Sequence, residues 1–577
     1  MAKSTRRRKA PGAEETEAAK GGEEFVFLPL GGVGEIGMNF ALYGYGPPAK
    51  REWMIVDVGV TFPGPDLPGV DLVLPDISFV MRERKRIRGI VITHAHEDHY
   101  GALLSLWPRI QAPVWMTPFA ADMLESKRMG ERDNRPPKPD VTTFEAGDRF
   151  KVGPFDVEAV HVTHSIPEPV SLAIRTPAGM AVHTGDWKLD PEPGIDRPTD
   201  EKRFAELGEE GIDALICDST NAMREGTSPT EQAVNESLRG LIESAPGRVA
   251  IATFSSNVGR MVSVMEAARD ANRSVLVMGR SLKRVAEIAR ERGFFDGLPE
   301  LLTEDEFGHV PRENVVVLCT GSQGEERAAL AKIARDEHPR VALARGDRVI
   351  FSARAIPGNE KAILAVRNGL IERGIEIIDD GEHLVHVSGH PRRNELRRMY
   401  ELTKPKALVP VHGEAAHLVA HAALGEEAGI ETVVPARNGT MVLIAPGTPE
   451  LIGEEQSGRW FKDGNIVGSE AEVGVVDRRR LAFAGHASMS VLLDQRGELV
   501  DEPSIVCIGV PKEDDEGDAF EDLLYDAALD AIETMPRSRR KDPERVRDAV
   551  ASAMRSESRE IWGKRPIVTV HVSVIDT

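Results

Sequence analysis

The sequence predicts an α/β protein built from several domains. Its 577 residues are too many for one hydrophobic core, so two to four domains are expected. From residue 24 to about 225, short apolar runs such as "EWMIVDVGV" are broken by Gly and Pro, which indicates a layered α/β domain with much antiparallel sheet. From about 228, apolar runs alternate with amphipathic stretches, which is typical of a parallel sheet with helical crossovers.

The first three segments follow from this change of pattern. Residues 1–22 are polar, begin with a basic run and are predicted to form a disordered arm. Residues 23–227 form the first part of the layered domain. Residues 228–392 form a second domain, because "RVAIATF", "SVLVMG" and "NVVVLCTG" read as strands between helices such as "SLKRVAEIARERG".

Three further segments complete the chain. Residues 393–450 offer a helix, a strand that ends at His412 and another helix. Residues 451–475 are polar and are predicted to be a linker. Residues 476–577 hold strands, helices and the closing strand "RPIVTVHVSVID". This last unit carries no chemical motif, so we expect it to serve assembly.

Composition excludes some classes of protein. No run approaches the roughly 18 apolar residues of a membrane helix, and "MAKSTRRRKA" is not followed by an apolar signal core. Cys217, Cys319 and Cys507 lie far apart in apolar runs and are expected to be buried and reduced. A cytoplasmic protein without a membrane is therefore predicted. The net charge of −21 argues against a nucleic-acid partner, although it does not describe a local groove.

The stretch "ITHAHEDHYG" is the strongest chemical signal. His94, His96, Asp98 and His99 follow a predicted buried strand on a tight turn, where several of them can converge on one point. Imidazole and carboxylate are ligands of zinc or manganese, and with Glu97 the stretch offers five potential donors within six residues, which is more than one tetrahedral zinc needs. Two adjacent metal ions are implied.

Further ligands are expected at other strand ends. His164 lies in "VTHSIPE" and Asp186 in "HTGDWKLD". A carboxylate such as Asp186 could bridge two ions held about 3.5–4 Å apart, the spacing at which a shared hydroxide attacks an electrophile.

These motifs carry a family resemblance. "THAHEDHYG", "THSIPE" and "HTGDW", in this order, resemble the successive motifs of the metallo-β-lactamase superfamily, with Ala95 where many members have Gly. Thioester, lactam and phosphodiester hydrolases share these motifs. The resemblance therefore implies the fold and leaves the substrate open.

Motifs in the second half of the chain distinguish among these substrate classes. "ICDSTN", "HVSGH" and "VPVHGE" resemble motifs A, B and C of the β-CASP nucleases, and the resemblance extends to bacterial ribonuclease J enzymes over residues 24–577. It implies a metallo-β-lactamase αββα sandwich interrupted by an inserted β-CASP parallel α/β domain, plus a small C-terminal α/β domain.

The resemblance also implies roles for single residues. His94, His96 and His164 would hold one divalent metal ion, and Asp98, His99 and His412 would hold the other, with Asp186 between them. Zinc is expected, with Mn²⁺ or Mg²⁺ as alternatives. His390, oriented by Asp218, would act at the scissile phosphate, and Asp98 is also counted as catalytic. Glu97 is expected to lie outside the metal ligands.

The substrate is expected to bind near "HVSGH". The resemblance implies that this segment binds the 5′-terminal phosphate or the nucleotide that carries it. The residues are His386, Val387, Ser388, Gly389 and His390. Ser256 and Asn257 join a strand to a helix and could offer amides to a phosphate, or form only an ordinary turn.

The resulting hypothesis is a two-metal ribonuclease that acts in RNA processing and decay. It would degrade single-stranded RNA 5′ to 3′ from monophosphorylated ends and also cut internally, as a homodimer or homotetramer joined through the C-terminal domain. Other RNA-decay proteins are possible partners. The alternatives are a DNA nuclease, a small ester or thioester hydrolase, and a scaffold protein with a vestigial metal site.

Overall fold

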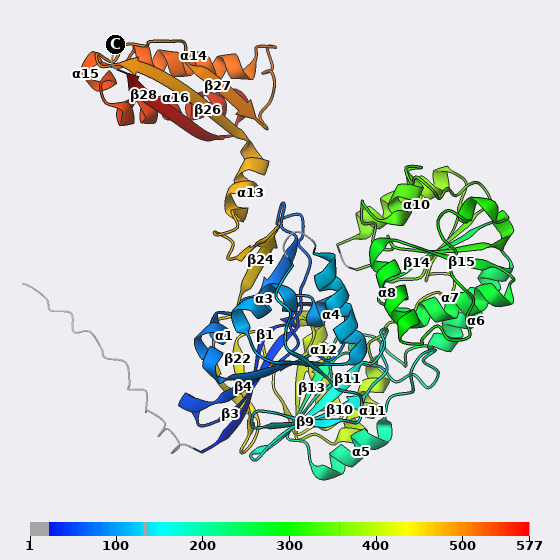
Figure 1. The fold of residues 1–577 in the computed structure, drawn as a ribbon. Helices are drawn as coiled ribbons and strands as arrows, with labels where there is room; N and C mark the ends of the chain where they lie inside the picture. Colours follow the sequence, from blue (N-terminus) through cyan, green and yellow to red (C-terminus); the bar gives the residue numbers. More distant parts are fainter. Residues whose placement is uncertain (1–21, 132–134, 357, 576–577) are drawn as a thin grey trace, which may run out of the picture. The chain divides into compact units, whose positions relative to one another are not determined.

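The computed structural model describes residues 22–131, 135–356 and 358–575 (Figure 1). The chain divides into two compact units. The first contains the residues up to Thr61 together with Leu74–Gly458, and the second contains Phe62–Val73 and Arg459–Thr577. The predicted arm lies outside the described residues except for residue 22.

Two sheets form the core of the first unit. One has eight strands in the order β23 (Glu450–Glu454), β22 (Thr440–Ala445), β1 (Glu24–Gly31), β3 (Phe40–Gly46), β4 (Glu52–Val56), β6 (Ile87–Val91), β7 (Val114–Met116) and β8 (Val141–Thr143). The other has seven, in the order β21 (Thr432–Val433), β19 (Ala407–Val411), β13 (Ala214–Asp218), β12 (Gly179–His183), β11 (Val170–Thr176), β10 (Phe155–His161) and β9 (Arg149–Val152).

The two sheets face each other across an apolar core. Phe25 and Tyr43 of the first sheet share one buried cluster with Phe155 and Leu172 of the second. Burial of each such side chain contributes about 1.5–3 kcal/mol. Because side chains alternate along a strand, the opposite faces of both sheets must be covered by helices.

Helices cover both outer faces. Trp53 of β4 is absent from the shared core and packs against Phe79 of α1, with ring centroids 5.0 Å apart. The outer face of the seven-stranded sheet packs on Phe204, Leu396 and Leu424. This is the expected αββα sandwich. Its helices are α1 (Ser78–Glu83), α3 (Leu103–Ile110) and α4 (Pro118–Gly130) on one side, and α5 (Glu201–Glu210), α11 (Arg393–Thr403) and α12 (Ala415–Glu427) on the other.

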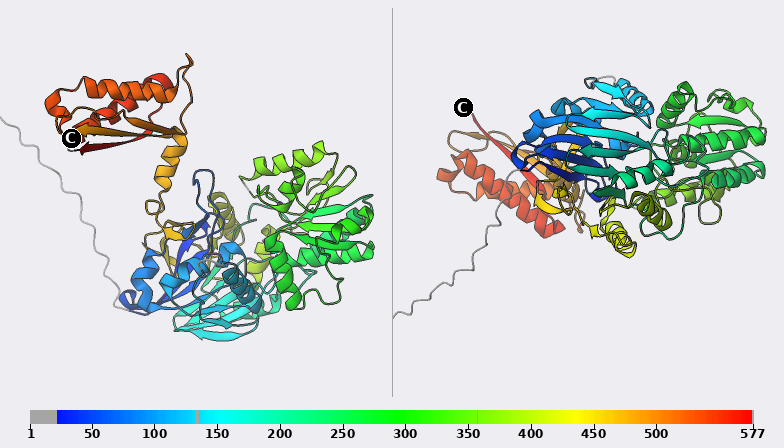
Figure 2. Two further views of the ribbon diagram at one scale, coloured as in Figure 1. Left: turned by 45° about the horizontal axis from the view of Figure 1, so that its top comes forward. Right: turned by 90° about the horizontal axis from the view of Figure 1, so that it is seen from below.

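A parallel α/β domain interrupts the sandwich. Strand β13 pairs with β19, so the chain leaves the sheet after Asp218 and returns to it at Ala407. The inserted sheet has the order β15 (Ser274–Met278), β16 (Val315–Cys319), β14 (Val249–Ala252), β17 (Arg348–Phe351) and β18 (Glu376–Ile378), and all its pairings are parallel. Its helices lie around the sheet (Figure 2): α6 (Glu231–Glu243), α7 (Val258–Asp270), α8 (Arg280–Glu291), α9 (Ala329–Ala334) and α10 (Glu360–Glu372).

Helix α9 is shorter than its sequence predicts. The pattern "GEERAALAKIARDE" suggests a helix from about residue 324, but the helix begins at Ala329. The amide of Leu330 donates to the carbonyl of Thr320, and Gly324 has a positive φ of 76°. These contacts turn the chain back to the end of β16, so the first predicted turn of helix cannot form.

The second unit contains a small sheet and a larger α/β fold. The segment 451–475, expected to be a linker, contains part of β23 together with β24 (Arg459–Asp463) and β25 (Ile466–Gly468), and β24 lies between β25 and β5 (Leu72–Pro75). After α13 (Val475–Ala484) follows a sheet in the order β27 (Ser504–Ile508), β26 (His486–Asp494) and β28 (Ile567–Ile575). It packs on α14 (Phe520–Glu533) and α16 (Pro543–Trp562), and α15 (Arg537–Arg540) precedes α16.

The three cysteines form no disulfide. Cys217 and Cys319 are buried as expected, whereas Cys507, which was also expected to be buried, is only half-buried. Within the described residues, no helix combines the length and apolarity needed to cross a membrane. The remaining elements are β2 (Val33–Gly34), β20 (Gly413–Glu414), α2 (Glu97–Tyr100), η1 (Pro48–Lys50), η2 (Arg84–Arg86), η3 (Phe307–His309) and η4 (Arg312–Asn314).

Candidate metal centre and active site

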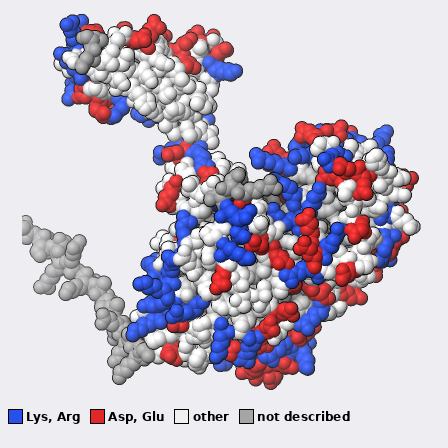
Figure 3. All heavy atoms as spheres, in the orientation of Figure 1, with Lys and Arg blue, Asp and Glu red and all other residues white. Residues whose placement is uncertain are grey.

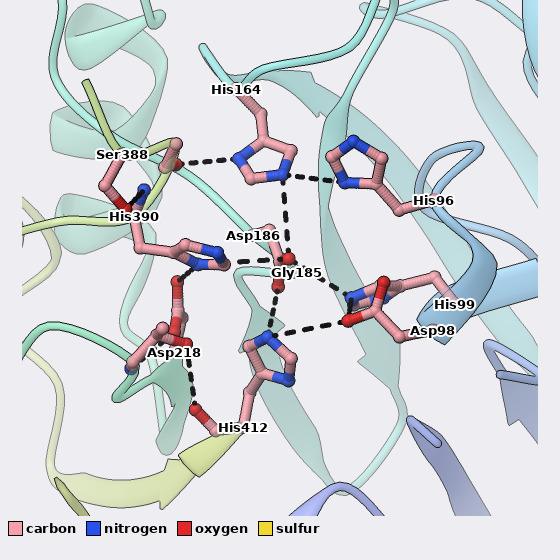
Figure 4. Close-up of polar contacts among 12 residues, drawn as sticks. His96, Asp98, His99, His164, Gly185, Asp186, Asp218, Ser388, His390 and His412 are labelled. Carbon is pink, nitrogen blue, oxygen red and sulfur yellow. Dashed lines mark hydrogen bonds and ion pairs between the residues drawn. The ribbon is translucent and has the colours of Figure 1, made fainter. Parts of the chain in front are cut away.

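Strand direction brings the predicted ligands together. β12, β13 and β19 are parallel neighbours, and β10 runs the same way because both β10 and β12 are antiparallel to β11. The carboxyl ends of these four strands therefore meet at one edge of the sheet. The side chains at or after these ends, which converge in Figure 4, are His164, Asp186, Asp218 and His412.

The turn that carries the H-x-H-x-D-H motif is held by its backbone. It follows β6 of the other sheet and forms the single helical turn α2. The carbonyls of Glu97, Asp98 and His99 accept hydrogen bonds from the amides of Val60, Asn39 and Val58 at 3.0, 2.9 and 2.6 Å. A Cβ on Gly59 would lie 1.7 Å from the Asp98 carbonyl oxygen, so only glycine allows this close approach.

One group of ligands surrounds a first position. His94, His96, His164 and Asp186 each present an atom within 4.8 Å of the others. His96 Nδ1 lies 3.1 Å from His94 Nε2 and 3.0 Å from His164 Nε2. Asp186 Oδ2 is 3.8 Å from His94 Nε2 and 3.6 Å from His164 Nε2. Three imidazoles and one carboxylate thus face a common point.

A second group shares Asp186 with the first. Asp98, His99, Asp186 and His412 also meet within 4.8 Å. His99 Nε2 lies 3.2 Å from Asp186 Oδ2, and His412 Nε2 lies 3.5 Å from Asp186 Oδ1. Asp98 Oδ2 is 3.6 Å from His99 Nε2. The two oxygens of Asp186 therefore face ligands of both groups.

The donor set fits divalent metal ions. Asp186 Oδ1 is buried and has no hydrogen-bond partner among the described residues. Burial lowers the pKa of His96 to about 4 and lowers the pKa values of His94 and His164 as well. These neutral rings direct nitrogen lone pairs at one another and at a carboxylate, an arrangement that a cation stabilises. The clusters therefore indicate divalent metal binding.

A second layer of polar groups orients the ligands. Asp57, which is 1% exposed, accepts a hydrogen bond from His99 Nδ1 at 2.7 Å and another from the amide of Thr93 at 2.8 Å. His412 Nδ1 donates to Asn39 Oδ1 at 2.9 Å, and His164 Nδ1 donates to the Gly389 carbonyl at 2.7 Å. Such partners fix the tautomer and orientation of a ligating histidine.

Asp57 and Asn39 were not predicted as site residues. Asp57 directly follows the apolar run "EWMIV", so it shows the same signal, an acid at a strand end, that identified Asp186. Asn39 offers no such signal, because it lies in a loop and meets His412 only through the fold.

The contact to Asp57 leads to a testable expectation. Asp57→Asn should weaken metal binding about 10–100-fold, because an amide can no longer accept the His99 proton while holding the Thr93 amide in the same way. Titration of the metal-free protein with Zn²⁺ would measure the change. Asp156→Asn, which removes an exposed pair with Arg149, is the matched control and should leave the affinity unchanged.

His390 lies beside the two groups that share Asp186, and with Asp218 and His412 it forms a third cluster whose possible ligand atoms lie within 4.8 Å of one another. Its Nδ1 donates to Asp218 Oδ2 at 2.7 Å and is 3.9 Å from Asp186 Oδ2 (Figure 4). Burial alone would lower the pKa of His390, but the charges of Asp218 and Asp186 outweigh it and raise this pKa to about 9. Bound cations would push the pKa back toward neutrality. Asp218 is buried and also accepts from the Thr220 amide at 2.8 Å.

The Glu97 carboxylate pairs with a lysine. Its Oε2 accepts from Lys127 Nζ at 2.6 Å, and it belongs to neither ligand group. The expectation that it lies outside the metal ligands agrees with this geometry.

The "HVSGH" segment borders a cavity with about 290 Å³ of empty space. Its lining includes His164, Lys188, Asn257, Val387, Ser388 and Gly389, whereas His386, His390 and Ser256 are not among the lining residues. Asn257 also caps helix α7, since its Oδ1 accepts from the Arg260 amide at 2.9 Å. The structure therefore brings four of the predicted substrate-binding residues to one cavity.

Two residues of this segment are constrained in other ways. A Cβ on Gly389 would lie 2.5 Å from the His164 ring, so a side chain here would displace a candidate metal ligand. His386 is half-buried, and its buried Nδ1 has no hydrogen-bond partner among the described residues. Burial, followed by the charges of Arg260 and Arg354, lowers the pKa of His386 to about 3, so this ring is neutral.

Family comparisons agree with the architecture. Residues 60–242 match the beta-lactamase superfamily domain, and residues 246–370 match the beta-CASP domain of ribonuclease J. Residues 374–435 match the RNA specificity domain of Zn-dependent metallo-hydrolases, and residues 473–575 match the C-terminal domain of ribonuclease J. Ribonuclease J of Sinorhizobium meliloti is 59% identical over 553 residues, which cover 96% of this chain and 98% of that protein. This chain belongs to the ribonuclease J family.

More distant ribonuclease J proteins match as well. That of Corynebacterium glutamicum is 37% identical over 83% of this chain and 66% of its own length, and that of Mycolicibacterium smegmatis is 36% identical over 93% and 95%. A crystal structure of a protein of unknown function from Enterococcus faecalis V583 aligns with a TM-score of 0.50 at 17% identity, over 73% of this chain and all of that one. This last likeness shows the fold alone.

Membership of the ribonuclease J family settles the class of activity. The chain is a metal-dependent RNA nuclease, because the ribonuclease J domains occur together and the relatives match along nearly the whole chain. The alternatives of a DNA nuclease and a small ester or thioester hydrolase are not favoured, and a scaffold with a vestigial metal site does not agree with this assignment.

Proposed function

We propose that this ribonuclease J holds two divalent metal ions and degrades single-stranded RNA in RNA processing and decay. It acts 5′ to 3′ from monophosphorylated ends and also cuts internally. The observation that carries the proposal is the pair of ligand groups sharing Asp186 beside His390. Zinc is the proposed ion, because imidazole-rich donor sets with carboxylates suit zinc, with Mn²⁺ and Mg²⁺ as the alternatives.

The proposed ligands follow the two groups. One ion would be held by His94, His96 and His164, the other by Asp98, His99 and His412, and Asp186 would contact both. When bound, the two ions activate a water molecule and neutralise charge on the phosphate. Metal analysis of the purified protein should give two ions per chain, and an analysis showing only one would contradict the proposal.

The protein's own residues supply the proton. As the bond between phosphorus and the 3′ oxygen breaks, His390 Nε2 donates its proton to that oxygen, while a new bond joins phosphorus to the oxygen of the water molecule, which gives up a proton to the solvent. Asp218 accepts from His390 Nδ1, which directs Nε2 towards the reacting group and favours the protonated ring. The products are a 3′ hydroxyl and a 5′ phosphate.

The surface of the protein carries charges of both signs. On the face drawn in Figure 3, Lys and Arg side chains are interspersed with Asp and Glu, so the net charge of −21 does not describe every part of the surface. The match of residues 374–435 to an RNA specificity domain supports RNA binding close to "HVSGH". His386 would support this loop, because its ring is neutral and half-buried.

End recognition is proposed for the cavity beside Ser388. RNA with a 5′ monophosphate should release mononucleotides at least about 10-fold faster than 5′-triphosphorylated RNA, because a tight pocket rejects the added bulk and charge. Ser388→Ala should reduce this release more than internal cleavage. Time courses on 5′-labelled and 3′-labelled RNA would separate the two modes.

Two results would contradict this assignment. Triphosphorylated RNA could shed mononucleotides as fast as monophosphorylated RNA, or Ser388→Ala could reduce both modes equally. His390→Ala is the matched control, since it should reduce both. Gly389 is unsuitable for this test, because a side chain there would meet His164.

The C-terminal domain is the proposed site of oligomer formation. Its sheet carries exposed apolar side chains on β27, with Val506 52% and Ile508 65% exposed, which supports a homodimer or homotetramer formed through this domain. Light scattering of the intact protein and of an Ile508→Lys variant would test it.

A cytoplasmic location agrees with the unpaired cysteines. Other RNA-decay proteins are candidate partners.

A further inference from the structure

The segment that follows Asp218 contacts His390 in two ways. Residues 219–221 come directly after strand β13. The Thr220 amide donates to Asp218 Oδ1 at 2.8 Å, and the other oxygen of this carboxylate accepts from His390 Nδ1. Asn221 Nδ2 donates to the His390 carbonyl at 3.1 Å. A displacement of this segment would therefore move both the ring and the backbone of His390.

The end of strand β19 holds the segment only weakly. The Ser219 amide and the Thr220 hydroxyl both donate to the His412 carbonyl, at 3.4 and 3.2 Å. Both distances lie beyond the usual range for hydrogen bonds of their kind. These two contacts alone would leave the segment free to shift.

A buried histidine supplies a shorter contact. His421 Nδ1 and Ser219 Oγ form a hydrogen bond of 2.8 Å, and both residues are 0% exposed. His421 lies on the buried face of helix α12, together with Leu424 and Gly425. The contact is shorter than either hydrogen bond to the His412 carbonyl. It therefore links the segment after Asp218 to a regular helix of the sandwich.

Apolar packing alone does not explain an imidazole at position 421. Its Nε2 is buried without a hydrogen-bond partner among the described residues, and the ring of Tyr400 is stacked against it with centroids 6.1 Å apart. Burial lowers the pKa of His421 to about 4, although the charge of Asp218 opposes the change, so the ring is neutral. A buried polar atom without a partner destabilises the folded state, and leucine would avoid this loss. What the imidazole offers here is its Nδ1, which reaches Ser219.

We propose that His421 and Ser219 are positioning residues for proton donation by His390. Neither belongs to a group of candidate metal ligands. Their hydrogen bond fixes residues 219–221, so that the His390 ring stays directed at the departing oxygen. Both cleavage modes should depend on it, because His390 acts on the scissile linkage in each. This inference rests on the proposed role of His390 and names the contact that supports it.

The first test measures kcat on linear monophosphorylated RNA and on circular RNA, which reports internal cleavage alone. His421→Leu and Ser219→Ala should each lower kcat about 10–100-fold on both RNAs, because a small displacement of a catalytic group has a large effect. The double variant should lose no more than the worse single variant, since both changes remove the same hydrogen bond. KM and metal content should stay unchanged.

Two further substitutions at position 421 separate the hydrogen bond from packing. An asparagine side chain places an amide atom where Nδ1 lies, whereas the longer glutamine side chain places its amide near Nε2. His421→Asn should therefore keep kcat within about 3-fold of the wild type, and His421→Gln should lose as much as His421→Leu. Tyr400→Phe is the matched control. It removes a hydroxyl that has no partner among the described residues from the ring stacked on His421, so kcat should not change.

RNA with sulfur in place of the departing 3′ oxygen shows which group the contact acts through. This leaving group needs no proton, so His421→Leu and Ser219→Ala should cleave the sulfur linkage nearly as fast as the wild type does. Equal losses on the sulfur and ordinary linkages, or loss of a metal ion, would overturn the inference, because the segment would then act through His412. Unchanged kcat in both single variants would overturn it as well and leave the role of His390 standing.

Two other outcomes have separate meanings. Asn221 also donates to Ser388 Oγ at 2.9 Å, so a loss confined to linear RNA would assign the contact to Ser388 and overturn the inference. If His390→Ala were equally slow on the sulfur and ordinary linkages, the proposed role of His390 would fail, and this inference with it. Melting temperatures are recorded for every variant, and Ser219→Ala keeps the test decisive if His421→Leu impairs folding.

Discussion

Replacing Asp98 and His99 by alanine is expected to lower hydrolysis of every RNA by at least about 10³-fold. Both residues belong to the group that shares Asp186, so the variant should lose one metal ion and the charge stabilisation that this ion provides. The fold should persist, because the strands beneath α2 belong to the buried core. Rates on linear and circular RNA, metal content and melting temperature would be measured together.

Glu97 offers the matched control for this variant. It lies in the same helical turn, but its carboxylate pairs with Lys127. Glu97→Gln should keep near wild-type rates and both metal ions. If the Asp98 and His99 double variant retained substantial activity, or if Glu97→Gln lost as much, the assignment of the second metal position would be wrong.

His390→Ala is expected to lower kcat about 10²–10⁴-fold, the range typical of a lost general acid. Asp218→Asn should produce a smaller loss of the same kind, because His390 would keep its ring and lose the carboxylate that orients it. Both exonuclease and internal cleavage should fall, and metal content should stay unchanged, because His390 is assigned to proton donation and not to metal binding.

A substrate with a better leaving group gives the sharper test of His390. In RNA that carries sulfur in place of the departing 3′ oxygen, the leaving group needs no proton. His390→Ala should therefore cleave this linkage nearly as fast as the wild type does. An equally slow reaction on the sulfur-containing and ordinary linkages would show that His390 acts in some other way.

Local patterns predicted much of the site. The ligands of "THAHEDHYG" lie within one turn, and His164 and Asp186 each follow an apolar run, so strand ends identified them as candidates. His412 also lies at the end of a strand, but its assignment as a ligand came from the family resemblance. The parallel sheet of the inserted domain was also predictable, because its strands are continuously apolar.

Contacts that depend on the complete fold were not predictable in the same way. Asn39 meets His412 across 373 residues of sequence, and no local pattern marks such a pair. The start of α9 depends on a hydrogen bond from Leu330 back to Thr320, which competes with the intrinsic helix preference of the segment. The resemblance to β-CASP nucleases suggested a phosphate-gripping loop, but only the packed structure shows that Gly389 lies directly against His164.

The measurement that tests the central claim most directly is anomalous X-ray diffraction from crystals of the enzyme loaded with zinc. Two peaks are expected about 3.5–4 Å apart. Each peak should lie about 2.0–2.2 Å from its ligand atoms: one among His94, His96 and His164, the other among Asp98, His99 and His412, with Asp186 contacting both. A single peak, or a pair of peaks away from Asp186, would contradict the two-metal account.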